Sequence, residues 1–338
     1  MNAQFLERPL RIIFLGTPDI VIPAAQLLAS HPSICCIDAV VTQKPARRGR
    51  GAESAEMPSA VHNWALSNAI PVFTPDSVGD PEFIAAIAQR QPDVFVTAAY
   101  GQYLPRRFLE IAPLGVLNIH PSLLPAYRGA APVQRAIEVG ETKTGVSVLF
   151  STPKMDAGPI AAQVEATIEG SDTASSLLPK LFLRGADLLL DVLKAYQARG
   201  RNGVDLREQD ESLATFAHKI AATESIVDPV NMDAATIVNK LRAFDPWPGV
   251  KIVFKIKHQP VDVKIIACKE IAPGDAPFEP GDSPGMARFG EDTLYILCKD
   301  RKSVLGISEL QLPSKRAMLA SVARNGWPGG VPELFLTP

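Results

Sequence analysis

The stretch Arg11-Ile-Ile-Phe-Leu-Gly16 decides the fold class of this chain. It is a short, continuous apolar run that ends at a glycine, which is typical of a strand buried on both faces of a parallel sheet. Thr17-Pro18-Asp19 follows at once and predicts a helix that runs to about residue 30. Because a strand buried on both faces needs helices on both sides, this first unit indicates an α/β fold.

Strand-like and helix-like segments continue to alternate up to about residue 200. Further strands are predicted at residues 37–42, 71–73, 93–98, 116–120, 145–151 and 160–168. Helices are predicted at residues 58–67, 80–90, 132–138 and 175–198, and a polar loop at residues 43–56. We therefore expect a first domain, residues 1–200, built on a mostly parallel, doubly wound sheet with helices on both faces.

The pattern changes after a polar segment without periodicity, residues 201–212, which we interpret as a linker. Beyond it, a helix is predicted at residues 234–242. Short strands follow at residues 251–257, 261–268, 293–298 and 304–310, separated by turns rich in Gly, Pro and Asp. This pattern predicts a second domain, residues 213–338, that forms a small β-barrel.

The composition is that of a globular protein and excludes several other classes. The chain has 338 residues, of which 46% are hydrophobic and 21% charged, so it can build more than one core and is not disordered. Its 34 Lys and Arg residues against 36 Asp and Glu give a net charge of -2. That balance argues against a general nucleic-acid coat protein but leaves room for a local basic site.

Neither a membrane span nor an export signal is predicted. No window approaches about 18 uncharged apolar residues, and the apolar run before Gly16 is too short for a signal peptide. The four cysteines, Cys35, Cys36, Cys268 and Cys298, show no C-x-x-C spacing, and we expect them to be buried thiols in a reducing compartment. These observations favour a cytoplasmic protein with no membrane partner.

The segment Asn118-Ile-His-Pro-Ser-Leu-Leu-Pro125 carries the most chemical information. A period of two places Asn118 and His120 on the same side of a strand, at its carboxyl end, where ligands bind in open α/β sheets. A histidine beside a carboxamide can donate hydrogen bonds to an oxygen that gains negative charge during acyl transfer. The alternative is that His120 is a structural histidine at the end of a strand.

A second candidate is Asp156, within the turn-like segment Met155-Asp-Ala-Gly-Pro159. A single aspartate in a turn is often there only because it stabilises the turn. The functional interpretation is that Asp156 pairs with His120 and fixes the orientation of its ring. The sequence does not establish that the two side chains meet.

Motifs for nucleotides and metals are incomplete. Gly16 lacks the further glycines of G-x-G-x-x-G, and Arg48-Gly-Arg-Gly51 lacks the Lys and Ser or Thr of a P-loop. The five histidines show no spacing typical of metal ligands, so no metal is expected.

Basic residues are concentrated in two places. Lys44, Arg47, Arg48 and Arg50 lie in the loop at residues 43–56, which is either an ordinary solvated loop or a contact for phosphate groups. Residues 240–270 add seven basic residues against three acidic ones. Two basic stretches in an acidic chain indicate that both could recognise one polyanion.

Five segments resemble the methionyl-tRNA formyltransferase family, and the resemblance covers nearly the whole chain. They are Arg11-Ile-Ile-Phe-Leu-Gly-Thr-Pro-Asp19, Ala99-Tyr-Gly-Gln-Tyr-Leu-Pro105, Asn118 to Pro125, Arg128-Gly-Ala-Ala-Pro132 and Ala243-Phe-Asp-Pro-Trp-Pro248. The third segment is shared by the wider group of formyltransferases that use 10-formyltetrahydrofolate. The last segment and the basic loop narrow the resemblance to enzymes that act on tRNA.

The resemblance implies a Rossmann-like catalytic domain of the formyltransferase type, an OB-like barrel that binds tRNA, and roles for individual residues. Asn118, His120 and Asp156 would be the catalytic set. Ser122, Leu123, Leu124 and Pro125 would bind the co-substrate 10-formyltetrahydrofolate, and Arg47, Arg48 and Arg50 would bind initiator methionyl-tRNA. The basic loop continues as Ala52-Glu-Ser-Ala-Glu56, where the family often has lysines, which predicts weaker affinity for phosphate.

The expected activity is therefore transfer of a formyl group to the α-amine of initiator methionyl-tRNA by a monomeric enzyme. One alternative is a formyltransferase that acts on a small amine such as an amino-sugar nucleotide, which would share the first 200 residues but need no basic barrel. Another is a tRNA-binding module without catalysis, against which the complete set of Asn118, His120 and Asp156 argues.

Overall fold

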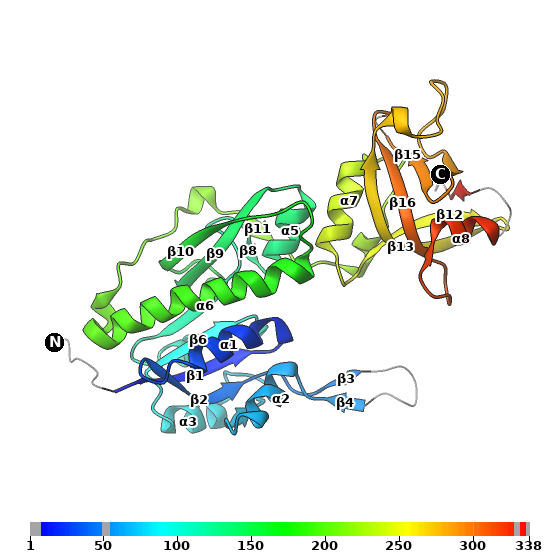
Figure 1. Ribbon diagram of the computed structural model, residues 1–338. Coiled ribbons are helices and arrows are strands. Elements are labelled where there is room, and N and C mark those ends of the chain that lie inside the picture. Colours follow the sequence, from blue (N-terminus) through cyan, green and yellow to red (C-terminus); the bar gives the residue numbers. More distant parts are fainter. Residues whose placement is uncertain (1–7, 49–54, 300, 328–331, 336–338) are drawn as a thin grey trace. The chain divides into compact units, whose positions relative to one another are not determined.

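The computed structural model describes residues 8–48, 55–299, 301–327 and 332–335 (Figure 1). The chain divides into two compact units. Unit 1 comprises residues 1–132, 143–167 and 176–217, and unit 2 comprises residues 133–142, 168–175 and 218–338. The domain limits 1–200 and 213–338, with a linker at 201–212, stay a prediction.

Unit 1 is built on a seven-stranded sheet with the order β10-β9-β7-β6-β1-β2-β5. The strands are β1 (Leu10–Gly16), β2 (Cys35–Val41), β5 (Val72–Phe73), β6 (Val94–Ala98), β7 (Val116–His120), β9 (Lys143–Phe150) and β10 (Ile160–Thr167). The first five of these pair in parallel. At one edge β9 runs antiparallel to β7, and β10 antiparallel to β9. The predicted mostly parallel sheet is confirmed.

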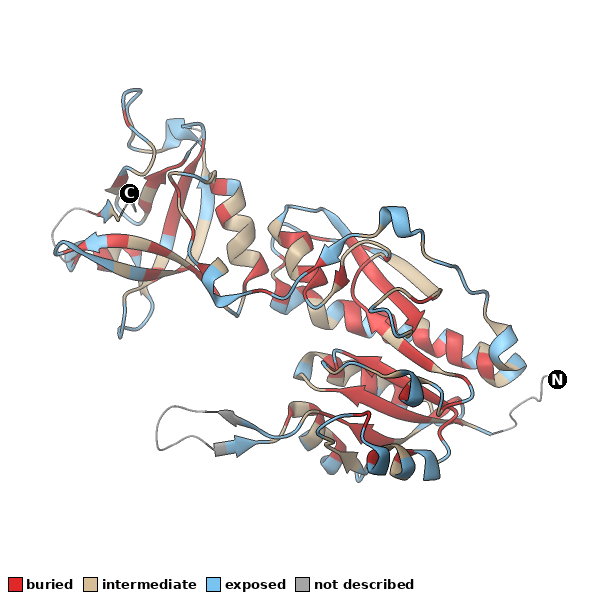
Figure 2. Cartoon of the chain, turned by 180° about the vertical axis from the view of Figure 1, so that it is seen from behind, coloured by how far each residue is buried: buried red, intermediate tan, exposed pale blue. Residues whose placement is uncertain are grey.

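Helices cover both faces of this sheet. One core contains residues from α1 (Ile22–Ala29), α2 (Ala60–Ser67) and α6 (Ala174–Arg199), and the other from α3 (Pro81–Gln89) and α4 (Arg106–Leu109). Alternate residues of β1 enter the two cores: Ile12 and Phe14 the first, Ile13 and Leu15 the second. Figure 2 shows the resulting burial along the central strands. The doubly wound arrangement inferred from Arg11-Ile-Ile-Phe-Leu-Gly16 is therefore correct.

Capping residues account for where two of these helices begin. The side chain of Ser59 accepts a hydrogen bond from the backbone N–H of His62 at the start of α2. Asp80 caps α3 in the same way through the N–H of Glu82, and Pro81 supplies a first helical position that needs no donor. A short 3-10 turn at Asp19–Val21 leads into α1.

The expected polar loop at residues 43–56 contains two short strands instead. β3 (Ala46–Arg48) and β4 (Ala55–Met57) pair antiparallel, with Arg47 across from Glu56. The prediction of a loop here was wrong because strands of three residues are too short to show an alternating pattern.

Residues 200–217 lie along unit 1. After a 3-10 turn at Gly200–Gly203, the backbone of Arg207 forms two hydrogen bonds with that of Ile160, at 2.8 and 3.0 Å. Farther on, β11 (Phe216–Ala217) pairs in parallel with β8 (Arg128–Gly129). The polar segment that we interpreted as a linker thus has regular backbone partners in unit 1.

Unit 2 contains an antiparallel sheet with the order β14-β15-β16-β13-β12-β18, with β17 paired to β16. Its strands are β12 (Val250–Ile256), β13 (Gln259–Ile271), β14 (Ala287–Phe289), β15 (Leu294–Leu297), β16 (Val304–Gln311), β17 (Met318–Leu319) and β18 (Glu333–Leu334). They form a near-closed barrel with helices α7 (Ala234–Ala243) and α8 (Ala320–Asn325), which confirms the predicted small β-barrel. Most of α5 (Pro132–Glu138) also belongs to this unit.

Two further expectations can be compared with the structure. Among the described residues, no helix is long and apolar enough to cross a membrane. Cys35 and Cys298 are buried, but Cys36 is exposed and Cys268 is partly exposed, so the expectation of four buried thiols was wrong. Cys36 lies on the opposite face of β2 from the buried Cys35, near the start of the strand, where it is exposed.

A glycine allows α6 to lie against the strands that carry the candidate site. A Cβ at Gly185 would lie 2.3 Å from Cγ2 of Ile119 in β7 and 2.8 Å from Cγ2 of Val146 in β9. We predict that Gly185→Val lowers the free energy of unfolding by about 1–3 kcal/mol, because the added carbons force the helix away from a packed sheet.

Differential scanning calorimetry of Gly185→Val beside Leu183→Val checks this prediction. Leu183 is an exposed position of the same helix, so its variant introduces the same β-branched residue without the steric conflict. Its expected effect is within about 0.5 kcal/mol. Equal melting temperatures for the two variants would contradict the close approach of α6 to β7.

Candidate active site

Strand β7 delivers two of the candidate residues to one end of the sheet. Asn118 and His120 are its third and fifth residues, and they lie across from Leu149 and Ser147 of β9. The side chain of His120 is 5% exposed. Both side chains meet the same carboxylate, which agrees with the predicted placement of the two on one side of the strand.

That carboxylate belongs to Asp156, and the structure brings all three predicted catalytic side chains together. Oδ1 of Asp156 accepts a hydrogen bond from Nδ2 of Asn118 at 3.3 Å. Oδ2 accepts one from the backbone N–H of Gly129 at 2.9 Å and lies 3.7 Å from Nδ1 of His120. The carboxylate is only 14% exposed, so these donors replace much of its lost hydration.

The other ring nitrogen fixes the tautomer of His120. Nε2 lies 3.0 Å from the backbone carbonyl oxygen of Tyr127, which can only accept, so Nε2 carries a hydrogen. In the neutral ring the lone pair is therefore on Nδ1, the atom that faces Asp156. Nδ1 and the carboxylate lie 3.7 Å apart, which is within the distance of an ion pair but longer than a hydrogen bond.

The loop that presents Asp156 has an unusual backbone. Asp156 has φ = 49°, in the left-handed region that non-glycine residues seldom adopt. Two residues later, a Cβ at Gly158 would lie 1.8 Å from the carbonyl oxygen of Phe150, so only glycine fits. This close approach folds the loop back onto the end of β9 and turns Asp156 toward β7.

The predicted folate-binding residues form a tight loop directly after His120. Oγ of Ser122 donates to the carbonyl oxygen of Ala126 at 2.7 Å, and the N–H of Leu124 donates to Oγ of Ser147 at 3.2 Å. Ser122 and Leu124 are buried, whereas Leu123 and Pro125 are partly exposed. The loop therefore has a fixed shape and offers apolar surface next to the candidate catalytic residues.

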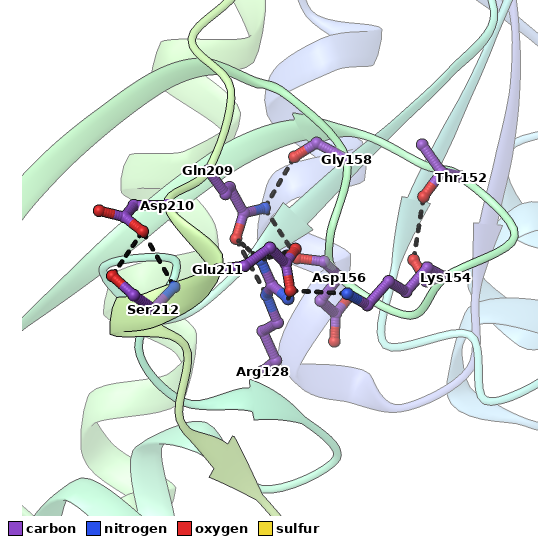
Figure 3. Close-up of polar contacts among 9 residues, drawn as sticks. All are labelled: Arg128, Thr152, Lys154, Asp156, Gly158, Gln209, Asp210, Glu211 and Ser212. Carbon is purple, nitrogen blue, oxygen red and sulfur yellow. Dashed lines mark hydrogen bonds and ion pairs between the residues drawn. The ribbon is translucent and has the colours of Figure 1, made fainter.

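Sequence reasoning missed a group of polar residues beside Asp156 (Figure 3). Arg128, although 1% exposed, donates from Nε and Nη2 to Oε1 of Gln209 at 3.0 and 2.8 Å. It also donates from Nη1 and Nη2 to the two carboxylate oxygens of Glu211 at 3.1 and 3.0 Å. Lys154 binds the same carboxylate at 2.6 Å. These cations, Arg128 first, lower the pKa of Glu211 to about 2.

The predicted tRNA-binding arginines are only partly described. The backbone of Arg47 and Arg48 lies in β3, and Arg50 lies outside the described residues. In unit 2, Lys251 lies 3.4 Å from Asp262 and Lys255 lies 3.2 Å from Glu333, so carboxylates offset part of the basic character there.

A cavity of about 540 Å³ lies near the other end of β7. Val116, the first residue of the strand, lines it together with Thr152 and Arg201, whose guanidinium lies 4.9 Å from the ring centre of Phe150. Neither Asn118, His120 nor Asp156 lines this cavity. Within the described part of the chain, no cluster of three or more His, Cys, Asp or Glu side chains could hold a metal ion.

Two segments of the chain match known protein families. Residues 10–193 match the family described as formyl transferase, and residues 219–327 match the formyl transferase C-terminal domain. The methionyl-tRNA formyltransferase of Chloroflexus aggregans is 38% identical and aligns with 97% of this chain and all of the relative. The enzyme of the same name from Kosmotoga olearia is 33% identical over 94% of this chain and 96% of the relative.

Solved structures share the fold at low identity. The N-formyltransferase of Helicobacter canadensis, determined with folinic acid and dTDP-3-aminofucose, has a TM-score of 0.59 at 18% identity over 88% of this chain and 99% of that one. HypX of Aquifex aeolicus in complex with tetrahydrofolic acid has a TM-score of 0.58 at 17% identity over 95% of this chain. The chain spans 48% of HypX.

The sequence matches extend through both units of the chain, and the structure has the doubly wound sheet and the barrel that they imply. The curated relatives align over nearly their whole length. The chain therefore belongs to the methionyl-tRNA formyltransferase family.

Proposed function

We propose that this protein transfers the formyl group of 10-formyltetrahydrofolate to the α-amine of initiator methionyl-tRNA. The observation that carries the proposal is the meeting of Asn118 and His120 at the carboxylate of Asp156, the first through a hydrogen bond and the second at 3.7 Å. The cluster lies at the carboxyl end of a strand, in a chain whose curated relatives are named methionyl-tRNA formyltransferases. Asn118, His120 and Asp156 are the proposed catalytic residues.

The reaction joins the amine nitrogen to the formyl carbon and breaks the bond between that carbon and N10 of the folate. The amine loses a proton and N10 gains one. Attack on the formyl carbonyl places negative charge on its oxygen, which the amide of Asn118 and the protonated Nδ1 of His120 can stabilise. Asp156 orients His120 and assists removal of the proton from the amine, and N10 of the folate takes up a proton as it leaves.

The backbone around His120 supports this division of roles. Because Nε2 is occupied by the carbonyl of Tyr127, Nδ1 is the ring nitrogen that can face both Asp156 and the formyl oxygen. One oxygen of Asp156 is held by Asn118 and the other by Gly129, so the carboxylate cannot rotate away without losing a donor. Groups fixed in this way need little reorganisation when charge develops in the transition state.

The two substrates would contact different parts of the chain. The loop of Ser122, Leu123, Leu124 and Pro125 is the proposed folate contact, because it directly follows the catalytic strand and exposes part of Leu123 and Pro125. Arg47, Arg48 and Arg50 are the proposed contacts for tRNA phosphates. The barrel of unit 2 is proposed to bind the same tRNA. A monomeric, cytoplasmic enzyme remains our expectation.

Transfer to a small amine, such as an amino-sugar nucleotide, is less well supported. Curated relatives between 33% and 39% identical carry the tRNA-specific name. A solved relative with an amino-sugar nucleotide is only 18% identical, which is evidence for the fold alone. A module that binds tRNA without catalysis would have no need for the three-residue cluster.

Replacing His120 by alanine tests the proposed reaction. The variant removes a group that acts on charge present only in the transition state, so kcat should fall by about 10²-fold or more. The affinity for the folate substrate should change little. The measurement is transfer of labelled formyl from 10-formyltetrahydrofolate to charged initiator tRNA, with wild-type protein alongside.

Two outcomes of this assay would count against the proposal. If the wild-type protein transfers no formyl group to the tRNA, the proposed function is wrong. If His120→Ala transfers formyl groups at the wild-type kcat, the proposed function stands but His120 is not a catalytic residue.

The salt dependence of tRNA binding tests the three arginines. Each arginine that neutralises a phosphate releases counterions, so Arg47, Arg48 and Arg50 all replaced by alanine should make the log–log salt slope shallower by roughly 2 to 3 units. Folate binding should survive, because the proposed folate loop lies elsewhere in the sequence. Filter binding or fluorescence titration between low and high salt gives the slope.

A matched control removes the same charge from another surface of unit 1. Lys143, Arg184 and Lys194 are exposed side chains to which we assign no role in catalysis or binding. Their triple alanine variant should keep the wild-type slope. Equal slopes for wild type and the Arg47, Arg48 and Arg50 variant would show that these arginines contact no phosphate and lie in an ordinary solvated segment.

A further inference from the structure

Arg128 lies between the two residues whose backbones hold the proposed catalytic pair. The carbonyl oxygen of Tyr127 accepts the hydrogen bond from Nε2 of His120, and the N–H of Gly129 donates to Oδ2 of Asp156. Any displacement of Arg128 therefore moves the partners of both His120 and Asp156. The distance between these two catalytic groups depends on where the guanidinium of Arg128 is fixed.

The guanidinium is fixed by residues 209–211, which lie in the segment that we first interpreted as a linker. A buried guanidinium is costly unless acceptors surround it. Gln209 and Glu211 supply three acceptor atoms, at distances between 2.8 and 3.1 Å. The backbone completes the attachment, because the N–H of Arg128 donates to the carbonyl oxygen of Thr215 at 2.9 Å.

Gln209 also holds the loop that carries Asp156. Its Nε2 donates to the carbonyl oxygens of Asp156 and Gly158, at 2.8 and 2.7 Å (Figure 3). The amide orientation follows from chemistry alone, since Nε2 faces two acceptors while Oε1 faces the donors of Arg128. One side chain thus joins the backbone of Asp156 to the residue between Tyr127 and Gly129.

Glu211 adds a second connection between Arg128 and the loop that carries Asp156. Its carboxylate binds Arg128 on one side and Lys154, two residues before Asp156, on the other. The left-handed backbone of Asp156 costs free energy. It persists only where surrounding contacts offset that cost. The contacts of Gln209 and Glu211 hold the backbone of this loop from outside, while Asn118 and Gly129 hold the carboxylate of Asp156.

We infer that Gln209 and Glu211 are positioning residues of the formyl transfer reaction, which act through Arg128 and the backbone of Asp156. They set the separation of Asp156 from His120 and touch neither substrate. This inference rests on the proposed function, because it assumes that Asp156 and His120 are catalytic. It assigns residues 209–211 to the active site of unit 1.

Gln209→Glu is the sharpest test. The change keeps the size of the side chain and its contact with Arg128, but it places a carboxylate oxygen against two carbonyl oxygens and removes both donated hydrogen bonds. We expect kcat to fall by about 10- to 10²-fold, the range that a small misplacement of a catalytic group produces. The KM for tRNA and for folate should remain within about threefold of wild type, since the interaction lost serves only the transition state.

Glu208→Gln is the matched control. Glu208 is the exposed neighbour of Gln209, and the described residues supply no hydrogen bond or ion pair to its side chain. It should keep the wild-type kcat. Glu211→Gln removes a charge from the same segment and should lower kcat by more than about threefold, because the carboxylate of Glu211, unlike that of Glu208, binds Arg128. It carries the test if Gln209→Glu shows no cooperative thermal transition.

A double-mutant cycle with Asp156→Asn separates positioning from general damage to the structure. If Gln209 acts through Asp156, Gln209→Glu should cost less than about threefold in kcat when Asp156 is already asparagine. An equal cost in both backgrounds, or a wild-type kcat for both Gln209→Glu and Glu211→Gln, would overturn the inference. Failure of the proposed function is distinguishable, because it requires that the wild-type protein transfers no formyl group or that Asp156→Asn is fully active.

Discussion

The largely covered carboxylate of Asp156, only 14% exposed, is the group on which the rest of the site depends. Such a carboxylate is stable only where donors replace its water, and here the donors come from two other parts of the chain. Asn118 approaches from β7 and the backbone of Gly129 from the segment after it, with Nδ1 of His120 at 3.7 Å. Satisfying this one charge brings together the three side chains that we propose as the catalytic set.

The antiparallel edge of the sheet makes that meeting possible. β9 runs back along β7, so the loop between β9 and β10 begins beside the start of β7 and must fold over to reach His120. Gly158 permits this fold by allowing the loop to contact the carbonyl of Phe150. Gly185 permits α6 to cover the same strands closely. Gly158 thus shapes the loop that carries Asp156, and Gly185 the packing behind β7 and β9.

Much of the fold could be predicted from local sequence pattern. The apolar run at β1 and the alternation in β7 are properties of neighbouring residues, so they identified the doubly wound sheet and the shared side of Asn118 and His120. The antiparallel pairing of β9 could not be predicted, because parallel and antiparallel strands with two buried faces have similar composition. The hairpin of β3 and β4 was too short to show a period.

The support for the site was hidden for a different reason. Gln209 and Glu211 act through an amide, a carboxylate and backbone carbonyls, none of which leaves a periodic or apolar signal in the sequence. A polar segment without periodicity has the same sequence pattern whether it is a solvated linker or is bound to a buried arginine. Only the contact with Arg128, more than 80 residues away, distinguishes the two cases.

The identity of the acceptor amine is the central claim, and a competition assay tests it most directly. Labelled 10-formyltetrahydrofolate is supplied with charged initiator tRNA and an amino-sugar nucleotide in one reaction, and the label on each acceptor is followed from the first turnover. Our account predicts that the label accumulates on the α-amine of the methionyl-tRNA. Label that accumulates on the amino sugar while the tRNA stays unformylated would contradict it.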